Sequence, residues 1–305
     1  MPRLSKNERH DLARARLIRV VRNHGIANAR TIEQKVADSG PPGMRIDPHV
    51  LTPVRKELEE DGVLRCRKCA GTDWFFHRDT PQETIEARLK EQLPLYRALQ
   101  RGDLRKRLGQ TLEIATFRAL RQGPFRDYLG RFLDLDDHDD SELYKKEEPP
   151  SYLGDRDAGN KKLDFLVSHP CAGWAGIEVK NLREWLYPDR NEVRELLEKC
   201  LALDALPVLI ARRIHFSTFR LLNSYGVIVH QTYNQRFPVA AQALAEKVKH
   251  KDSLGYHDIR VGNSPDPRLL CFINKLPDLL VAQRKKFDQS RQRIENYLDR
   301  FRIVR

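Results

Sequence analysis

Apolar positions in the first eighty residues recur every three to four residues in three stretches, and two short apolar runs follow them. This spacing predicts three amphipathic helices, because residues three or four apart share one face of a helix. We expect the helices at about residues 12–24, 29–37 and 48–61. Asp47 is suited to begin the third helix and Gly62 to end it. The two apolar runs, 63–69 and 74–77, flank a Gly-Thr-Asp turn and predict a β-hairpin.

From residue 103 onward, helical and strand patterns alternate. The expected elements are a helix, two strands, a helix, a strand, a helix and a strand. They lie at about residues 103–122, 162–168, 174–181, 191–204, 207–213, 216–225 and 227–230. This order predicts an α/β fold with a central mixed sheet flanked by helices. Only two strands are clear before the helix at 191–204, and the places left for a third are around Tyr152 and Trp174.

The remaining segments are expected to be mainly helical. A charged helix over residues 81–100 should break near Pro94, since proline lacks the N–H that a helix needs. A helix is expected at 239–250, an irregular segment at 258–263, and a helix from 266 to 302 with a break near Pro277. The basic residues near the C-terminus could follow a phosphate backbone or form a solvated face.

The two strands between Lys162 and Asn181 carry charged residues within apolar runs. Alternate residues of a strand share a face, so Glu178 and Lys180 lie on one side of the second strand. Asp164 interrupts the apolar pattern of the first strand in the same way. Burying such charges is costly unless they pair or hold a metal ion, so the hairpin predicts a catalytic site. The alternative is a surface hairpin with a Glu178–Lys180 ion pair and an open face at Gly176.

A carboxylate also stands on the apolar line of the helix expected at 103–122. Glu113, Phe117 and Leu120 are spaced so that they follow one line on the helix surface. Gly109, one turn earlier, leaves space over the carboxylate. Glu113 could therefore belong to the same site, although a surface glutamate or a pair with Arg118 would also fit.

Glu113, Asp164 and the run Glu178-Val179-Lys180 resemble the motif of the PD-(D/E)XK, or restriction-endonuclease-like, nucleases. The order of elements over about 130 residues is similar to the core of that family. The family's proline is absent, since Leu163 precedes Asp164.

This resemblance implies metal-dependent hydrolysis of phosphodiester bonds. Asp164 and Glu178 would bind Mg²⁺, for which Mn²⁺ can substitute, with the Val179 carbonyl as a further ligand. Glu113 would hold a metal-bound water or a second ion. Lys180 would orient or help to deprotonate the attacking water and stabilise the developing charge.

Residues 51–64 resemble the third helix and first wing strand of winged helix-turn-helix domains. The resemblance implies that this helix lies in the major groove of DNA, although such domains also bind proteins and the helix could simply be solvated. Candidate DNA contacts are Arg45, Arg55, Lys56, Arg65, Arg67 and Lys68. Arg212 and Arg213, at the end of the strand at 207–213, could contact phosphate or pair with an acidic neighbour.

Composition favours a nucleic-acid partner. The 305 residues carry a net charge of +12, which suits a polyanion, with nucleic acid first and an anionic membrane second. A merely soluble basic protein is the alternative. No apolar run approaches the roughly 20 residues of a membrane span, and the first ten residues lack the apolar core of a signal peptide, so we expect a cytoplasmic protein without a membrane partner.

Two other segments contain residues of the types that bind metal ions. Cys66 and Cys69 form a single Cys-x-x-Cys pair with His77 nearby, but a structural zinc ion wants four ligands, so zinc is unlikely. Residues 134–148 are strongly acidic and predict a solvated, mobile loop.

These patterns together predict four parts: a winged-helix DNA-binding domain (1–80), a helical linker (81–102), a nuclease core (103–235) and a helical extension (236–305). The predicted function is a metal-dependent DNA endonuclease, sequence- or structure-selective. A homodimer is expected, because cutting a duplex needs two active sites. The alternatives are a non-enzymatic DNA-binding regulator with a nuclease-like interaction domain, and a nuclease that acts on RNA.

Overall fold

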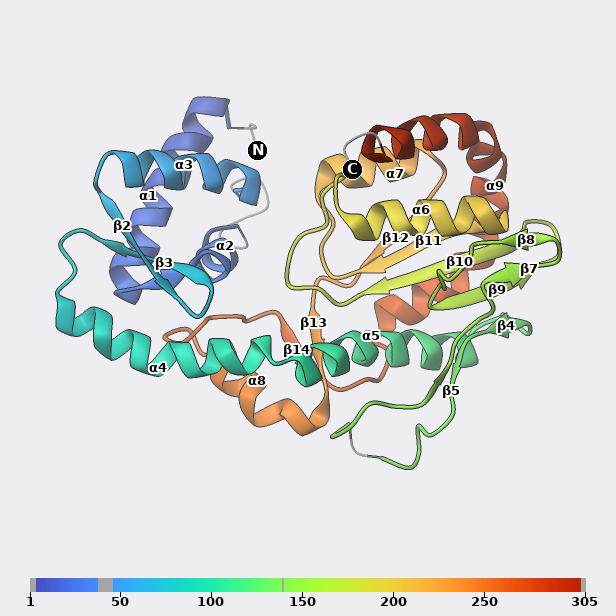
Figure 1. Ribbon diagram of the computed structural model, residues 1–305, viewed down its shortest axis with the longest axis horizontal. Helices are drawn as coiled ribbons and strands as arrows, with labels where there is room; N and C mark the ends of the chain where they lie inside the picture. Colours follow the sequence, from blue (N-terminus) through green and yellow to red (C-terminus); the bar gives the residue numbers. More distant parts are fainter. Residues whose placement is uncertain (1–3, 38–45, 139, 303–305) are drawn as a thin grey trace. The chain divides into compact units, whose positions relative to one another are not determined.

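The computed structural model describes residues 4–37, 46–138 and 140–302 (Figure 1). The chain forms two compact units. The first comprises Met1–Leu104 and Ala243–Ile259, and the second comprises Arg105–Gln242 and Arg260–Arg305. Both are mixed α/β structures. Among the described residues, no helix is long and apolar enough to cross a membrane.

The first unit contains the three helices and the hairpin expected from the sequence. The helices are α1 (Lys6–His24), α2 (Ala29–Ala37) and α3 (Pro48–Glu60). The strands are β1 (Ala27–Asn28), β2 (Leu64–Cys69) and β3 (Thr72–His77), in the order β1-β3-β2. Leu17, Val54 and Phe75 are among the buried residues that join the helices to this sheet.

Local signals explain where α1 begins and ends. The Ser5 hydroxyl accepts a hydrogen bond from the Glu8 N–H, and the Glu8 carboxylate accepts one from the Ser5 N–H. This reciprocal pair satisfies two N–H groups that a helix start leaves without partners. Gly25, with φ of 75°, ends the helix in a backbone conformation that favours glycine.

Residues 81–102 are not a separate linker. Helix α4 (Gln82–Gln100) runs without a break through Pro94 and belongs to the first unit. Ile85 and Leu89 are buried, and the ring of Tyr96 meets Trp74 edge-on with centroids 5.7 Å apart. Packing of this face therefore offsets the hydrogen bond lost at the proline. Helix α8 (Gln242–Lys249) also lies largely in the first unit, so the expected C-terminal extension is divided between the two units.

A five-stranded mixed sheet forms the centre of the second unit, in the order β12-β11-β10-β9-β4. The strands are β4 (Tyr128–Leu129), β9 (Phe165–His169), β10 (Gly173–Lys180), β11 (Leu206–Ala211) and β12 (Ile228–Gln231). Strands β4, β9 and β10 are antiparallel, while β10, β11 and β12 are parallel. The places considered for a third early strand were wrong: Trp174 lies in β10 and Tyr152 in a separate ribbon, and the strand is β4.

Helices α5 (Gly102–Gln122) and α6 (Asn191–Leu203) cover opposite faces of this sheet (Figure 1). On the α5 side, the ring of Phe117 stacks on Phe165. On the α6 side, a Cβ added at Gly176 would lie 2.9 Å from Cys200 Sγ and 2.5 Å from a methyl carbon of Leu163. The face at Gly176 is therefore covered, and the reading of an open surface hairpin is wrong.

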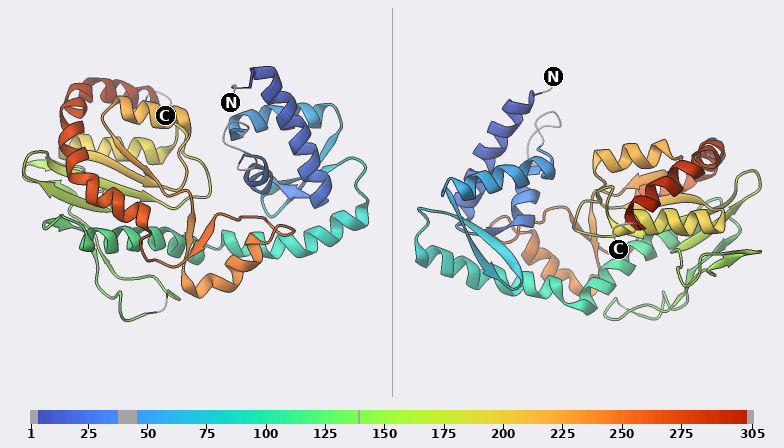
Figure 2. Two further views of the ribbon diagram at one scale, coloured as in Figure 1. Left: turned by 180° about the vertical axis from the view of Figure 1, so that it is seen from behind. Right: turned by 45° about the horizontal axis from the view of Figure 1, so that its top comes forward.

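Helices α7 (Phe216–Ser224) and α9 (Pro267–Arg302) complete the second unit (Figure 2). Helix α9 passes Pro277 without the expected break. The segment expected to be irregular contains β14 (Ile259–Val261), which pairs with β13 (Gln235–Phe237). Two-stranded ribbons are formed by β5 (Arg131–Phe132) with β6 (Lys146–Glu147), and by β7 (Tyr152–Leu153) with β8 (Arg156–Asp157).

Candidate active site

The acidic residues expected to act together do meet in the second unit. Helix α5 supplies Glu113, β10 supplies Glu178 and Lys180, and Asp164 directly precedes β9. Phe165 pairs with Ile177 in the antiparallel pair of β9 and β10, so Asp164, one residue before Phe165, lies beside Glu178, one residue after Ile177.

Asp164 is fixed by the backbone of β10. Its N–H donates to the Ile177 carbonyl at 3.1 Å, and its carboxylate Oδ2 accepts the Val179 N–H at 2.7 Å. The carboxylate therefore lies beside the β10 backbone, within reach of side chains from both faces of the sheet. The sequence alone could not decide this, because one residue of register moves every side chain to the other face.

The Val179 carbonyl has an orientation that suits the expected ligand role. The Lys180 carbonyl accepts the Arg212 N–H at 3.2 Å and so points toward β11. Carbonyls of successive strand residues point to opposite edges. The Val179 carbonyl therefore points toward the β9 edge, where Asp164 lies.

A lysine that the sequence analysis did not single out joins two of the carboxylates. Lys146 Nζ lies 2.8 Å from Glu113 Oε2 and 3.0 Å from Asp164 Oδ1, and its side chain is only 8% exposed. Glu113 is therefore neither a surface glutamate nor the partner of Arg118. Lys146 stands at the end of the acidic run, where the sequence offers no periodicity to mark it.

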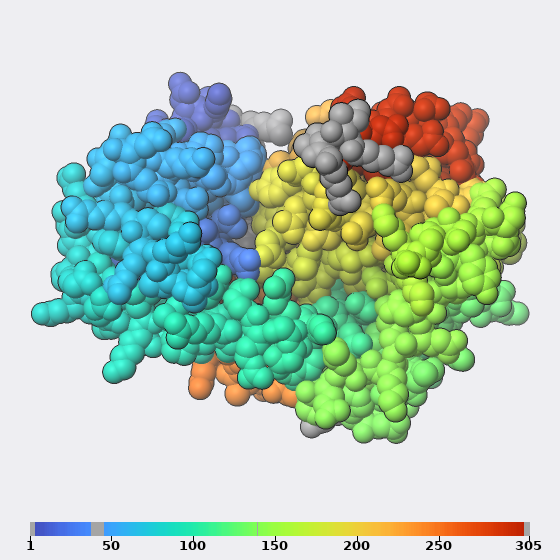
Figure 3. Space-filling model, viewed as in Figure 1, coloured from blue at the N-terminus to red at the C-terminus, as the bar shows by residue number. Residues whose placement is uncertain are grey.

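The acidic run is also more ordered than expected. Asp140 is buried and accepts hydrogen bonds from the Val239 N–H at 2.9 Å and from the Asn263 amide at 2.8 Å. The Tyr144 hydroxyl donates to the same carboxylate. In Figure 3 the green part of the second unit lies on the face shown. The expectation of a solvated loop is therefore wrong for Asp140, which buried hydrogen bonds hold to the second unit. The other described side chains of the run are mostly exposed, as expected; they include Asp136, Asp137, Glu142, Glu147 and Glu148.

Glu178 is held by two lysines. Lys180 Nζ lies 2.6 Å from Oε1, and Lys199 Nζ, from α6, lies 2.7 Å from Oε2. Lys199 also donates to the Lys162 carbonyl at 2.9 Å. Lys199 was missed, although a signal existed: it stands on the apolar stripe of α6, between Leu196 and Cys200.

The charges of the site act on one another through Asp164. Burial and then the charge of Asp164 raise the pKa of Glu113 to about 7, although Lys146 opposes the rise. Burial and Asp164 also raise the pKa of Glu178. Burial alone would lower the pKa of Lys180, but Glu178 and Asp164 outweigh it and raise this pKa. Asp164 therefore lies close enough to repel both Glu113 and Glu178.

This set of donors fits a divalent ion of the Mg²⁺ type. Such ions take oxygen ligands, and the site offers carboxylates and a main-chain carbonyl. Each carboxylate oxygen has two lone pairs, so an oxygen that accepts from a lysine can still bind a metal ion.

The candidate DNA contacts of the first unit have different surroundings. Arg45 lies outside the described residues. Arg55 is partly buried, with its guanidinium 4.4 Å from the centre of the Phe75 ring and 3.4 Å from Glu59. The exposed candidates are Lys56, Arg65, Arg67 and Lys68, of which Arg67 pairs with Glu86.

The two arginines after β11 also differ. Arg212 is 2% exposed and donates to the Arg183 carbonyl at 2.7 Å, so a role in phosphate contact is wrong for it. The guanidinium of Arg213 lies 5.7 Å from the Trp185 ring and 5.2 Å from the Tyr233 ring.

Cys66 and Cys69 are not arranged with His77 as zinc ligands. They are three residues apart on β2, so their side chains point to opposite faces. Across the hairpin Cys66 pairs with Phe75, while His77 pairs with Leu64.

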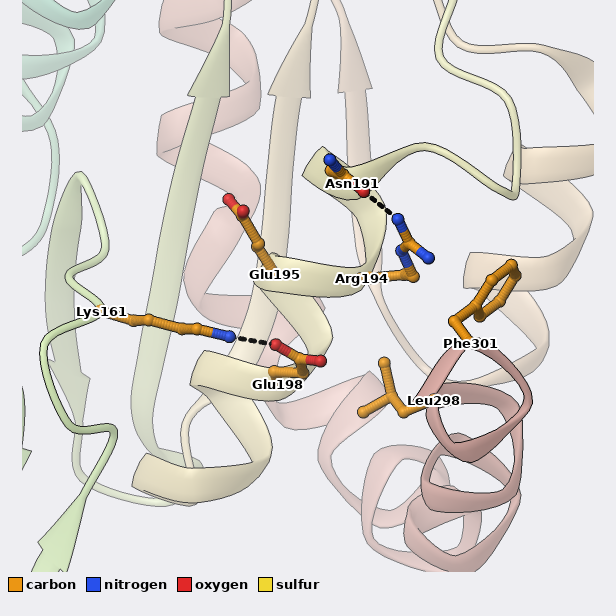
Figure 4. A pocket seen from close by; sticks show the side chains of 7 residues that line it. All are labelled: Lys161, Asn191, Arg194, Glu195, Glu198, Leu298 and Phe301. Carbon is orange, nitrogen blue, oxygen red and sulfur yellow. Dashed lines mark hydrogen bonds and ion pairs between the residues drawn. The ribbon is translucent and has the colours of Figure 1, made fainter. Parts of the chain in front are cut away.

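A pocket of this unit that does not include the residues around Asp164 is shown in Figure 4. It lies between α6 and the end of α9, with Leu298 and Phe301 on one side. Its Lys161 pairs with Glu198 and its Arg194 donates to Asn191, so these charged groups have local partners.

Comparison with known proteins finds no family model, no curated protein and no solved structure that matches the chain. The activity must therefore be inferred from the side chains around Asp164.

Proposed function

We propose that the protein is a metal-dependent endonuclease that hydrolyses phosphodiester bonds of DNA. The observation that carries the proposal is the meeting of Glu113, Asp164 and Glu178 in a buried site, with Lys180 bonded to Glu178. The succession of α5, β4, β9, β10, α6 and β11 supports it, because this order resembles the PD-(D/E)XK core implied by the sequence motif.

Asp164, Glu178 and the Val179 carbonyl would hold a divalent ion, which when bound supplies a water of lowered pKa and a positive charge beside the phosphate. The chain contributes the geometry. The Val179 N–H fixes the Asp164 carboxylate, and Lys199 fixes Glu178 from the α6 side.

Lys180 would act as a hydrogen-bond donor in this site. Its Nζ lies 2.6 Å from Oε1 of Glu178, one of the proposed metal ligands. The ammonium can hydrogen-bond the attacking water and stabilise negative charge that develops on the phosphate. Deprotonation of the attacking water is the other role that the sequence motif implies for Lys180.

We propose that the first unit supplies DNA affinity as a winged-helix domain. Three helices followed by a hairpin are consistent with such a domain. Lys56 on α3 and Arg65 and Lys68 on β2 are exposed, and basic groups of this kind neutralise phosphates. Cutting both strands of a duplex would then require two copies of the chain.

The test is nicking of supercoiled plasmid with and without Mg²⁺, alongside a gel-shift measurement of DNA binding. We expect Asp164→Ala and Lys180→Ala to lose cleavage and keep binding, because Lys56 and Lys68 of the first unit are unchanged. Glu198→Gln, in the separate pocket of Figure 4, serves as the control and should cleave normally.

Full cleavage by both site variants would refute the site. Metal-independent DNA binding without cleavage by the unmodified protein would favour the non-enzymatic regulator instead. Cleavage of RNA but not of DNA would change the substrate and keep the chemistry.

A further inference from the structure

The Glu113 side of the site already contains a cation that belongs to the protein. The Lys146 ammonium bridges Glu113 Oε2 at 2.8 Å and Asp164 Oδ1 at 3.0 Å. A third carboxylate, that of Glu148, lies 3.7 Å away. These are the contacts that a metal ion shared by Glu113 and Asp164 would need.

Several contacts hold Lys146 in this place. Its backbone pairs with Phe132 in the β5–β6 ribbon. Its ammonium lies 5.4 Å from the centre of the Phe165 ring and 5.9 Å from that of Phe132, and both rings stabilise a cation. With 8% of the side chain exposed, little water reaches the group. The position of Lys146 in the site is therefore fixed by its backbone pairing, its aromatic neighbours and its burial.

We infer that Lys146 is a resident cation that takes the place of a second metal ion, so that the protein binds one divalent ion, at Asp164 and Glu178. The inference rests on the proposed function, since it concerns the metal ion of that site. A second divalent ion between Glu113 and Asp164 would need the oxygens that Lys146 uses, and it would meet a positive charge a few ångströms away in a poorly solvated site.

Charge balance supports the same conclusion. Among the described residues of the site, the carboxylates are Glu113, Asp164, Glu178 and the more exposed Glu148, and the ammonium groups that contact them are those of Lys146, Lys180 and Lys199. Removing Lys146 leaves one more negative charge and frees oxygens of two carboxylates. These are the conditions under which a second hard cation binds.

The test is a count of bound Mn²⁺ by electron paramagnetic resonance, with thermal unfolding as the check that each variant is folded. We expect one ion for the unmodified protein and two for Lys146→Met. Lys146→Arg keeps the positive charge and should bind one. Lys146→Met combined with Glu113→Gln removes one ligand of the new site and should return the count to one.

Two bound ions in the unmodified protein, or one in a folded Lys146→Met, would overturn the inference and leave the nuclease proposal standing. No bound ion in either protein would refute the metal-dependent function itself.

Glu113→Gln alone gives a test that does not depend on the folding of the Lys146 variant. If Glu113 binds Lys146 and not the metal ion, the single Mn²⁺ should keep its affinity within about twofold. A loss of about tenfold or more, the size typical when support of a metal site is removed, would show that Glu113 serves the metal and that Lys146 does not replace it.

Discussion

Lys199 offers a strong test of how the site is held together. The side chains of Lys199 and Glu178 are 6% and 5% exposed, and their charged atoms lie 2.7 Å apart. Lys199→Met keeps most of the length of the unbranched side chain and removes the charge. Of the ion pairs that Glu178 makes with described residues, the pair with Lys180 then remains, and the hydrogen bond from Lys199 to the Lys162 carbonyl is lost. Breaking a buried pair from one side costs about 3–5 kcal/mol, because the remaining charge stays out of water.

We therefore expect Lys199→Met to lower the free energy of opening of the second unit by about 3 kcal/mol, the lower end of the range for a broken buried pair. The assay is hydrogen exchange of the β10 and β11 amides, which reports opening of the sheet that carries Glu178. Lys161→Met is the matched control. Lys161 also pairs with a glutamate of α6, but its side chain is 52% exposed, and such pairs contribute about 1 kcal/mol or less.

A double-mutant cycle identifies the partner. In a Glu178→Gln background no buried charge remains for Lys199 to neutralise, so Lys199→Met should cost about 2 kcal/mol less than in the unmodified protein. Equal costs in the two backgrounds, or a cost no larger than that of Lys161→Met, would refute the claim that this pair supports the site.

Two further predictions concern packing and pH. Gly176→Ala should lower the free energy of unfolding by about 1–3 kcal/mol in thermal unfolding, because the new methyl group would overlap Leu163 and Cys200. Gly102→Ala is the control and should be nearly neutral, because the space around Gly102 is open. Equal effects of the two substitutions would contradict the packing of α6 on β10. Burial lowers the pKa of His230 to about 4; the charge of Arg268 adds to this effect, and that of Asp266 opposes it. Between pH 6.5 and 4 the unfolded chain therefore takes up a proton that the folded protein does not, and the free energy of unfolding falls as the pH falls. Over that range the stability difference between the unmodified protein and His230→Phe should change by about 3 kcal/mol in urea unfolding, and a constant difference would show that His230 does not carry this dependence.

The sequence by itself determined the elements whose signals are local. Helix α1 ends at Gly25 as expected, and the hairpin of β2 and β3 follows from two apolar runs about a turn. The start of α1 at Lys6, six residues before the predicted start, was not predicted, although the reciprocal Ser5–Glu8 cap is also a local signal. The residues of the motif could also be predicted from the sequence, because a carboxylate within a buried apolar run is unusual. Glu113, Asp164, Glu178 and Lys180 all belong to the cluster that the structure forms.

Only the tertiary structure decided the features that depend on distant partners. Strand β4 has two residues and no pattern of its own, and it exists because β9 offers an edge. Pro94 and Pro277 stay inside helices because packing outweighs a lost hydrogen bond. Lys146 and Lys199 are separated along the chain from the carboxylates that they contact, which are Glu113, Asp164 and Glu178. The sequence next to each lysine does not indicate these partners. Which charges neutralise one another is a question of distance in space, and chain folding sets that distance.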